Sequence, residues 1–240
     1  RRGYPRRAGH AGHAGYHRYS GDVDLIAGLG CDTYRFSISW PRVLPEGRGT
    51  VNAAGLDFYD RLTDELLARQ IEPFATLYHW DLPLALEKQG GWTRRPVARC
   101  FADYTEVVVR RLGDRVKNWI TLNEPISVIA AGYASGDHAP GHKSLAKALR
   151  AAHFQMLAHG KAVQVIRAAG SQHRIGIANA LSPVYPLRKK DARLAARINS
   201  VLNGLFLDPI YKGRYPSALK PLMHLLAPVV RSRDLETIRQ

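Results

Sequence analysis

Strand-like and helix-like segments alternate along most of this chain, and this alternation constrains the fold more than any other feature. Short runs with strand character occur at residues 33–39, 71–78, 116–122 and 174–179. Segments with helical periodicity or helix-capping residues occur at residues 22–29, 55–70, 96–112, 144–169 and 191–207. Strands that are separated by helices form parallel sheets, so the sequence predicts an α/β protein.

The four expected strands begin about 40 to 60 residues apart, and most of the extra length follows each strand. Long loops after the carboxyl ends of strands are typical of (β/α)8 barrel enzymes, whose active sites are built from these loops. Periodicity alone also allows a doubly wound sheet, but no glycine-rich phosphate loop follows any expected strand. We therefore predict a (β/α)8 TIM barrel, present here as an incomplete barrel of about four βα units.

Composition is that of a globular protein. The chain has 240 residues, of which 45% are hydrophobic, and its longest apolar runs are too short to cross a membrane. Its opening residues are rich in Gly, Ala, His and Arg, so we expect a disordered basic tail at 1–15 and a partial barrel domain at 16–240. The two cysteines, Cys31 and Cys100, fit a reducing compartment better than a disulfide framework, which predicts a cytoplasmic protein.

The net charge of +15 raises the alternative of a nucleic-acid-binding protein. A third of this excess comes from the arginines that precede Asp22, and the rest is scattered over the faces of expected helices. Scattered charge without interleaved aromatic residues is typical of a solvated surface. We therefore expect no nucleic-acid partner and no membrane partner.

Polar and aromatic residues follow the expected strands, at the end where parallel strands deliver their side chains to one site. His79, Trp80 and Asp81 follow the second strand, and Asn123 and Glu124 follow the third. An indole ring offers a flat face to a sugar ring, while imidazole, amide and carboxyl groups can hydrogen-bond its hydroxyls. The pattern therefore indicates a site for a polyhydroxylated ligand, most naturally a sugar.

Each of these residues also has a plainer interpretation when it is considered alone. Glu124 suits the first turn of a helix, His79 suits a structural position, and Trp80 suits a core. Arg35 is different because it lies in the middle of a strand. We expect it to be buried and therefore to need a carboxylate partner, which this chain does not obviously supply.

Two pairs of histidines have a spacing that could suit a metal, but no Asp, Glu or Cys completes a ligand set. The pairs are His138 with His142, and His153 with His159. We expect these histidines on helix surfaces, and we expect neither a metal nor another cofactor.

Four motifs make the chain similar to glycosyl hydrolase family 1, the β-glucosidases and their relatives. They are Y-R-F-S-I-S-W-P-R at 34–42, Y-H-W-D-L-P at 78–83, T-L-N-E-P at 121–125 and G-Y-A-S-G-D-H-A-P-G at 132–141. A further run, D-P-I-Y-K-G-R-Y-P at 208–216, follows in the same order. The resemblance extends from about Tyr16 to the end of the sequence.

This resemblance implies a (β/α)8 barrel that hydrolyses β-glycosides with retention of configuration, using one acid/base carboxyl and one nucleophile. Glu124 matches the acid/base, and Asn123 matches the neighbour that holds the sugar 2-hydroxyl. His79 and Trp80 match residues that bind the glycone, and Arg35 matches the arginine that pairs with the nucleophile. The expected substrate is a β-glucoside or a related oligosaccharide, cleaved at terminal non-reducing β-D-glucosyl residues.

Several family features have no counterpart in these 240 residues. Family members have a strand with a glycone-binding glutamine ahead of the position of Tyr16, and the T-E-N-G motif of the nucleophile beyond that of Gln240. Leu122 and Ile126 also replace two aromatic residues that flank the acid/base motif. Retention needs two carboxyls about 5 to 5.5 Å apart, so we expect the 240 residues alone to have no or negligible glycosidase activity.

Other interpretations remain open from the sequence. The motifs are shared with 6-phospho-β-glycosidases, and a catalytically dead sugar-binding or assembly module would keep the same strand ends. We also expect self-association of the 240 residues through exposed barrel edges, because unpaired strand edges pair with other chains.

Overall fold

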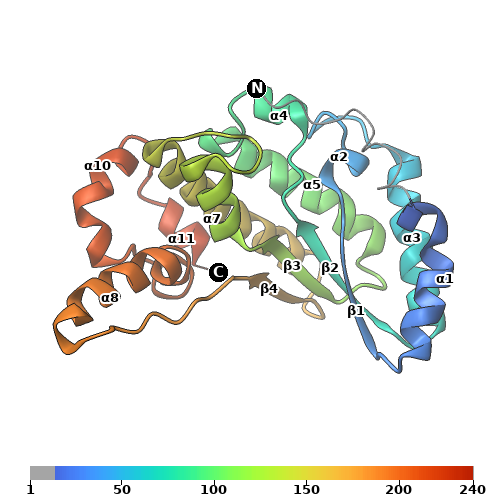
Figure 1. Cartoon of the computed structure of the whole chain (residues 1–240). Coiled ribbons are helices and arrows are strands. Elements are labelled where there is room, and N and C mark those ends of the chain that lie inside the picture. Colours follow the sequence, from blue (N-terminus) through green and yellow to red (C-terminus); the bar gives the residue numbers. More distant parts are fainter. Residues whose placement is uncertain (1–13, 240) are drawn as a thin grey trace.

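Four parallel strands form one sheet in the order β1-β2-β3-β4 in the computed structural model, which describes residues 14–239 (Figure 1). The strands are β1 (Thr33–Ser37), β2 (Glu72–Tyr78), β3 (Asn118–Asn123) and β4 (Arg174–Ala178). All three neighbouring pairs run parallel, so the carboxyl ends of the strands lie at the same end of the sheet. The predicted α/β class is confirmed, and each strand lies within two residues of its predicted bounds.

Three long helices connect the strands: α3 (Ala53–Ala68), α5 (Pro96–Leu112) and α7 (Leu145–Ala168). They lie on one face of the sheet in Figure 1. Helix α5 has the bounds that the sequence predicts, because Pro96 suits a first helical turn. Helix α7 is capped by Ser144, whose side chain accepts a hydrogen bond from the backbone N–H of Lys147 at 3.4 Å.

The loops after the strands contain short helical segments that shape the rim of the sheet. They are α2 (Trp40–Val43), α4 (Leu84–Lys88), a 3-10 turn at Gly91–Thr93, α6 (Pro125–Ser127) and a π-helical segment at Val128–Ser135. These segments follow β1, β2 and β3, so the long loops lie at the carboxyl ends of the strands, as the strand spacing predicts.

A buried aromatic cluster joins α5 to the ends of β1 and β2. Trp40 stacks on Tyr104 with ring centroids 5.2 Å apart, and Phe101 packs 5.4 Å from Trp40. The Tyr104 hydroxyl lies 3.1 Å from the backbone oxygen of Ile38 and 3.0 Å from that of Leu77. Because a buried hydroxyl needs a partner, these contacts hold the carboxyl ends of the two strands against the helix layer.

The first helix is longer than the sequence predicts. Helix α1 (Ala14–Gly28) begins eight residues before the predicted start at residue 22, and Gly30 follows it with φ +73°. Tyr16 stacks on Phe58 of α3 with ring centroids 4.7 Å apart, so a contact distant in sequence extends the helix. The predicted disorder of residues 1–15 falls mainly on residues 1–13, which lie outside the described residues.

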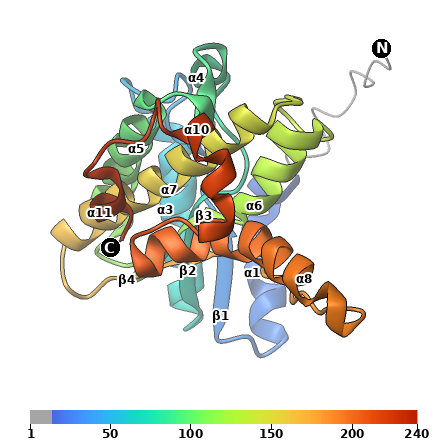
Figure 2. The ribbon, with the colours of Figure 1, turned by 90° about the vertical axis from the view of Figure 1, so that its left-hand side faces the viewer.

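The segment after β4 forms a series of short helices beside α7 (Figure 2). These are a 3-10 segment at Lys189–Asp191, α8 (Ala192–Asn199), a π-helical segment at Ser200–Gly204, α9 (Leu205–Leu207), a second π-helical segment at Asp208–Lys212, another 3-10 segment at Ser217–Leu222, α10 (Met223–Leu226) and α11 (Asp234–Ile238). The predicted helix at 191–207 is helical from Ala192 to Leu207 without a break, and its stretch Ser200–Gly204 is π-helical. The described helices include none with both the length and the apolar composition needed to cross a membrane.

Candidate active site

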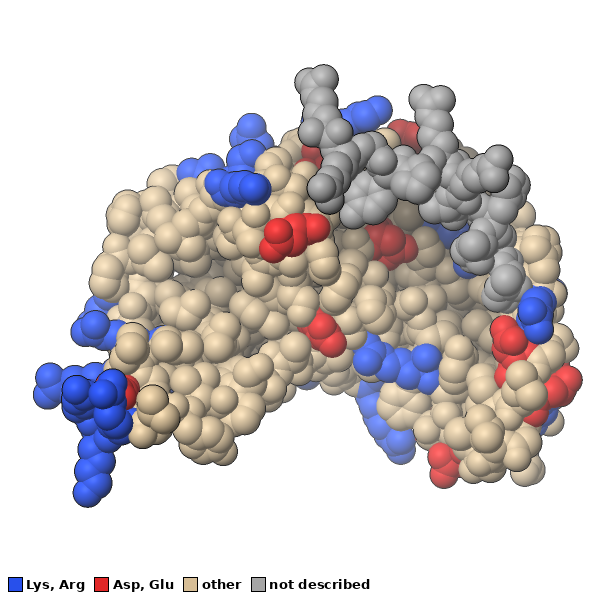
Figure 3. Space-filling view, in the orientation of Figure 1, with Lys and Arg blue, Asp and Glu red and all other residues tan. Residues whose placement is uncertain are grey.

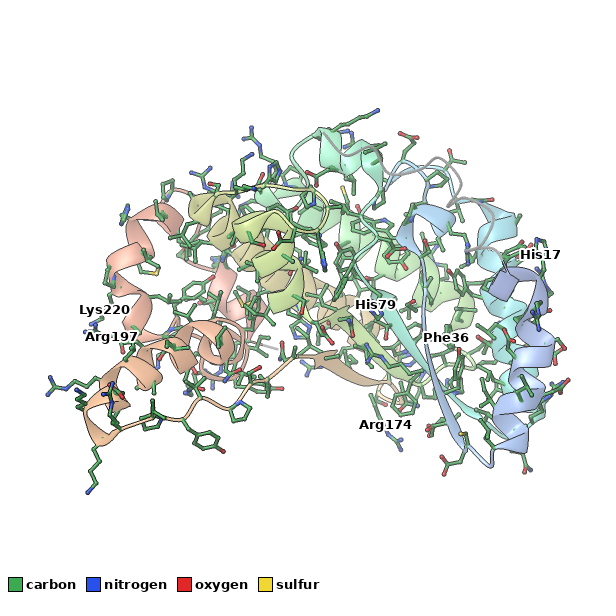
Figure 4. The ribbon with its side chains drawn as sticks, viewed as in Figure 1. His17, Phe36, His79, Arg174, Arg197 and Lys220 are labelled. Atoms are coloured by element: carbon green, nitrogen blue, oxygen red, sulfur yellow. The ribbon has the colours of Figure 1, made fainter. Side chains whose placement is uncertain are left out.

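A hydrogen-bond network joins four of the predicted site residues at the carboxyl end of the sheet, and Asn123 is its centre. The Asn123 side chain accepts a bond from Arg35 Nη2 at 2.6 Å, and its Nδ2 lies 3.1 Å from His79 Nε2. The Trp80 indole N–H donates to the Asn123 backbone oxygen at 2.9 Å. Three strands therefore contribute to a single polar site, and Figure 4 shows His79 over the sheet.

Glu124, the fifth predicted residue, begins the turn that leaves β3. Its backbone N–H donates to the backbone oxygen of Ala178 at 2.7 Å, which ties the turn to the end of β4. Its φ of +45° is unusual for a residue with a side chain, so the turn is held by its surroundings. Glu124 is partly exposed and joins the network through its peptide bond to Asn123.

Ser127 is a site residue that the sequence reasoning missed. Its hydroxyl donates to Glu124 Oε2 at 2.9 Å, and its backbone N–H donates to the Glu124 backbone oxygen at 2.9 Å. The second bond belongs to the first turn of α6 and gives Ser127 its place next to the carboxyl. The sequence did contain a signal for this contact, because Ser127 is a serine three residues after an acidic residue at the start of a helix.

Trp80 has a backbone conformation that directs its ring across the site. Its φ is +84°, and 38% of the residue is exposed although its indole N–H is hydrogen-bonded. The His138 ring lies 5.9 Å from the Trp80 ring. An indole fixed at one edge and open on a face can stack on a sugar ring, as expected from the sequence.

The predicted environment of Arg35 is wrong. Arg35 is exposed, and its partners are the Thr76 hydroxyl, at 2.9 Å from Nε, and Asn123. None of the ion pairs found in residues 14–239 includes it. Thr33, Arg35 and Ser37 of β1 are exposed while Phe36 between them is buried, and Arg35 extends over the exposed face to Thr76 and Asn123, so no buried charge requires a carboxylate.

Asp81 is a second carboxyl near the site, but its environment differs from that of a nucleophile. It follows Trp80 directly and is partly buried. Burial raises the pKa of the Asp81 carboxyl, and hydrogen bonding to Ser39 opposes this effect. A carboxyl held by neighbours and biased toward its protonated form suits a structural position better than attack on a sugar.

The surface position predicted for His153 and His159 is also wrong, because both side chains are buried. Helix α7 is enclosed by α5, the sheet and the C-terminal helices, so every residue from 151 to 160 is buried. Nδ1 of His159 lies 2.7 Å from the Thr121 hydroxyl, and burial lowers the pKa of His159 to about 4. No group of three metal-ligating side chains occurs in the part of the chain that the structure describes.

The family model of glycosyl hydrolase family 1 matches residues 4–240. The thermostable β-glucosidase B of Thermobispora bispora is 48% identical over 96% of this chain and 49% of its own length. β-Glucosidase A of Thermotoga maritima is 45% identical over 94% of this chain and 51% of its own length. The chain therefore spans about half the length of the curated relatives that it matches.

Solved structures show the same relationship. The psychrophilic β-glucosidase BglU of Micrococcus antarcticus has a TM-score of 0.89 and 49% identity, with 94% of this chain and 49% of that one covered. The Thermotoga maritima β-glucosidase in complex with castanospermine has a TM-score of 0.87 and 44% identity, with 94% and 51% covered. The four parallel strands are thus a partial (β/α)8 barrel, and the chain belongs to glycosyl hydrolase family 1.

Proposed function

We propose that this chain carries the acid/base side of a retaining β-glucosidase active site. In the first step Glu124 would protonate the glycosidic oxygen as the leaving group departs, and in the second it would deprotonate the attacking water. The observation that carries the proposal is the Asn123 network, because it places an arginine, an imidazole and an indole around the residue that precedes Glu124.

The proposed substrate contacts follow from this geometry. Asn123 would hold the sugar 2-hydroxyl, a contact that strengthens in the transition state, and His79 would hydrogen-bond a second hydroxyl. The exposed face of Trp80 would stack on the glycone. Arg35 has an exposed guanidinium at the end of the network, where it would pair with a nucleophilic carboxylate once one is present.

The 240 residues alone are proposed to have negligible hydrolytic activity. The family mechanism needs a second carboxylate close to Glu124. Of the described acidic residues, Asp81 is near the site, but it is partly buried and its pKa is raised by burial. The nucleophile would therefore come from outside these 240 residues.

The names of the relatives favour a glucosyl substrate over a 6-phosphoglycosyl one. The relatives from Thermobispora bispora and Thermotoga maritima are both β-glucosidases. One solved relative, the virulence factor SghA, is in complex with its substrate analogue salicin. We extend the β-glucoside preference to this chain, and we regard a catalytically dead binding module as the weaker alternative.

We also propose a cytoplasmic location and no nucleic-acid partner. Cys31 and Cys100 are both free thiols, which suits a reducing compartment. Among the described residues, eight arginines are compensated by ion pairs with acidic residues: Arg69, Arg95, Arg99, Arg110, Arg111, Arg115, Arg174 and Arg188. A single core extends from Val23 to Ile238, which supports one domain over residues 16–240.

A chimera tests the proposed function. These 240 residues would replace the matching part of the Thermobispora bispora enzyme, and hydrolysis of 4-nitrophenyl glucoside, galactoside and 6-phosphoglucoside would be compared. We expect the β-glucoside to be cleaved fastest. Glu124→Gln should lower that rate by about 10²- to 10⁴-fold, the usual contribution of an acid/base group.

Azide and a matched variant make the test specific. Added azide should restore turnover of activated aryl glucosides by Glu124→Gln with formation of a glucosyl azide, because azide needs no general base to attack the glucosyl-enzyme. Glu106→Gln on the exposed side of α5 should retain the parent rate. A folded but inactive parent chimera would favour the binding module, and an active Glu124→Gln chimera would exclude Glu124 as the acid/base.

A further inference from the structure

A small pocket lies beside α4 and the start of α5, apart from the proposed sugar site. Its volume is about 250 Å³, and its walls come from the loop after β1, from α4, from the 3-10 turn at Gly91–Thr93 and from α5. None of the described residues that line it belongs to the network at Asn123. The wall elements connect β1, β2 and β3 in order, so the pocket is built within consecutive βα units.

The floor of this pocket is apolar. Leu86, Val97 and Cys100 line it, and all three side chains are buried in the hydrophobic core. Pro96, in the first turn of α5, lines it as well. A concave apolar surface favours a ligand that has an apolar part to bury. The floor therefore suits a small organic molecule better than an inorganic ion.

Arg48 and Arg94 give the wall of the pocket a positive charge. None of the ion pairs found in residues 14–239 includes either arginine. Among the described residues that line the pocket there is no Asp or Glu. Glu87 of α4 lines a different pocket, where its Oε1 lies 3.5 Å from His142 Nε2. The two guanidinium groups therefore face a space that offers them no carboxylate.

Neighbouring residues hold both arginine side chains at the pocket. Arg48 Nη2 donates a long hydrogen bond to Gln89 Oε1, at 3.4 Å. Arg94 packs on Gly90, where φ is +100° and a Cβ would lie only 2.7 Å from Arg94 Cγ. A guanidinium has five N–H donors, so these contacts leave donors available to an anion.

The thiol of Cys100 is close enough to Arg48 to be affected by its charge. Burial raises the pKa of this thiol, and the positive charge of Arg48 opposes the rise. The apolar floor and the charged wall are therefore close together. Figure 3 shows further Lys and Arg side chains along the upper edge of the molecule, where Figure 1 places α4. Positive charge at this end favours the approach of an anion.

We propose that this pocket binds a small organic carboxylate, whose apolar body would rest on Leu86, Val97 and Cys100 while its carboxylate group pairs with Arg48 and Arg94. A planar carboxylate matches the fork of a guanidinium and can accept two hydrogen bonds from it. The inference concerns a second ligand site, so it does not depend on the chemistry proposed for Glu124.

The two cysteines of the chain provide the test, with benzoate as the probe. Cys100 lines the pocket, whereas Cys31 is exposed outside it and serves as an internal control. Both thiols of the 240-residue chain would be alkylated with iodoacetamide, which is uncharged, at constant ionic strength, and mass spectrometry of peptides would give the rate at each cysteine. Benzoate at about ten times its Kd should slow alkylation of Cys100 about tenfold and leave Cys31 unaffected.

Three glutamine variants identify the anion-binding groups. Arg48→Gln and Arg94→Gln should each raise the benzoate concentration that halves the rate at Cys100 by about tenfold or more, because each removes a charge-assisted contact. Arg61→Gln on the exposed face of α3 is the matched control and should behave as the parent. The rate without benzoate would be measured for every variant, and circular dichroism would verify that each one folds.

Two further probes separate the parts of the proposed ligand. Benzyl alcohol keeps the ring but lacks the charge, and inorganic phosphate keeps a charge but lacks the ring, so neither should protect Cys100 as benzoate does. Equal protection by either probe would overturn the proposed carboxylate site. Equal slowing of Cys31 and Cys100, or full protection that persists in both Arg48→Gln and Arg94→Gln, would also overturn it.

Discussion

The Arg35 guanidinium donates a hydrogen bond to the Asn123 side chain at 2.6 Å, although their strands, β1 and β3, are not neighbours in the sheet. The contact passes over β2, where Thr76 accepts a second bond from Arg35 at 2.9 Å. One arginine therefore cross-links three strands on the side of the sheet that carries the site. This arrangement explains how Asn123 can be held in a fixed orientation before a ligand binds.

Removal of the Asn123 amide should affect both stability and the site. Asn123 is only 4% exposed, and Asn123→Ala leaves Arg35 Nη2 and His79 Nε2 without their hydrogen-bond partner at this position. We expect a loss of about 1 to 3 kcal/mol, the usual cost of disrupting buried hydrogen bonds. Urea unfolding would measure this loss. Asn199→Ala on the exposed surface of α8 is the control, and an equal effect of both substitutions would contradict the central position of Asn123.

The sequence predicted most of the sheet and helix layer because their signals are local. Pro96 marks the start of α5, Ser144 caps α7, and strand periodicity locates β1. The residues that form the network at Asn123 could also be predicted, because residues that follow parallel strands lie at one end of the sheet.

Other features depend on contacts that a local pattern does not contain. Arg35 is exposed although Phe36 beside it on β1 is buried, and its partners Thr76 and Asn123 lie in two other strands of the sheet. The burial of His153 depends on its contacts with Tyr215 and Asp234. Both partners lie more than sixty residues away in the sequence. The early start of α1 likewise depends on Phe58, in a different helix.

The buried His159 should make the stability of the protein depend on pH in the mildly acidic range. Burial lowers the pKa of His159 to about 4, from an ordinary value of 6.5. The unfolded chain therefore binds this proton more readily, so stability is complete above about pH 6.5 and falls as the pH decreases toward 4. We expect a loss of about 1 to 2 kcal/mol between pH 7 and pH 5.

His159→Gln tests this pH dependence because glutamine can still hydrogen-bond the Thr121 hydroxyl but does not titrate. Urea unfolding of both proteins at a series of pH values would compare the slopes. The variant should lose less stability on acidification than the parent. Parallel curves over this range would show that His159 is not the source of the slope.

Asp234 should produce a second loss of stability at lower pH. Burial raises the pKa of this carboxyl, but hydrogen bonds from Arg95, the Arg231 backbone N–H and His153 outweigh that effect and hold the pKa at about 2. Its salt bridge to Arg95 has an N–O distance of 2.5 Å. Stability from this group is present above about pH 4 and is lost as the pH falls toward 2, by about 2 kcal/mol in all.

Asp234→Asn should flatten the stability curve in that window and lower stability at neutral pH. The neutral side chain can no longer compensate the partly buried Arg95 guanidinium, which helps to hold α11 against the rest of the molecule. Asp137→Asn at an exposed loop position is the control. A steep fall in stability below about pH 4 that persists in Asp234→Asn would assign this transition to other carboxyls.

Gln70 offers a test of backbone strain away from the site. It follows α3 with φ +60°, a conformation that costs a residue with a Cβ about 1 to 2 kcal/mol, and its side chain is exposed. Gln70→Gly removes this strain but increases the entropy of the unfolded chain, so we expect a net stabilisation of about 0.5 to 1 kcal/mol.

Arg69→Gly is the matched variant. Arg69 has a φ of −102°, and its replacement should destabilise the protein because it also removes the ion pairs to Asp24 and Glu65. Thermal unfolding of both variants would decide the sign, and a lower melting temperature for Gln70→Gly would contradict the strained conformation.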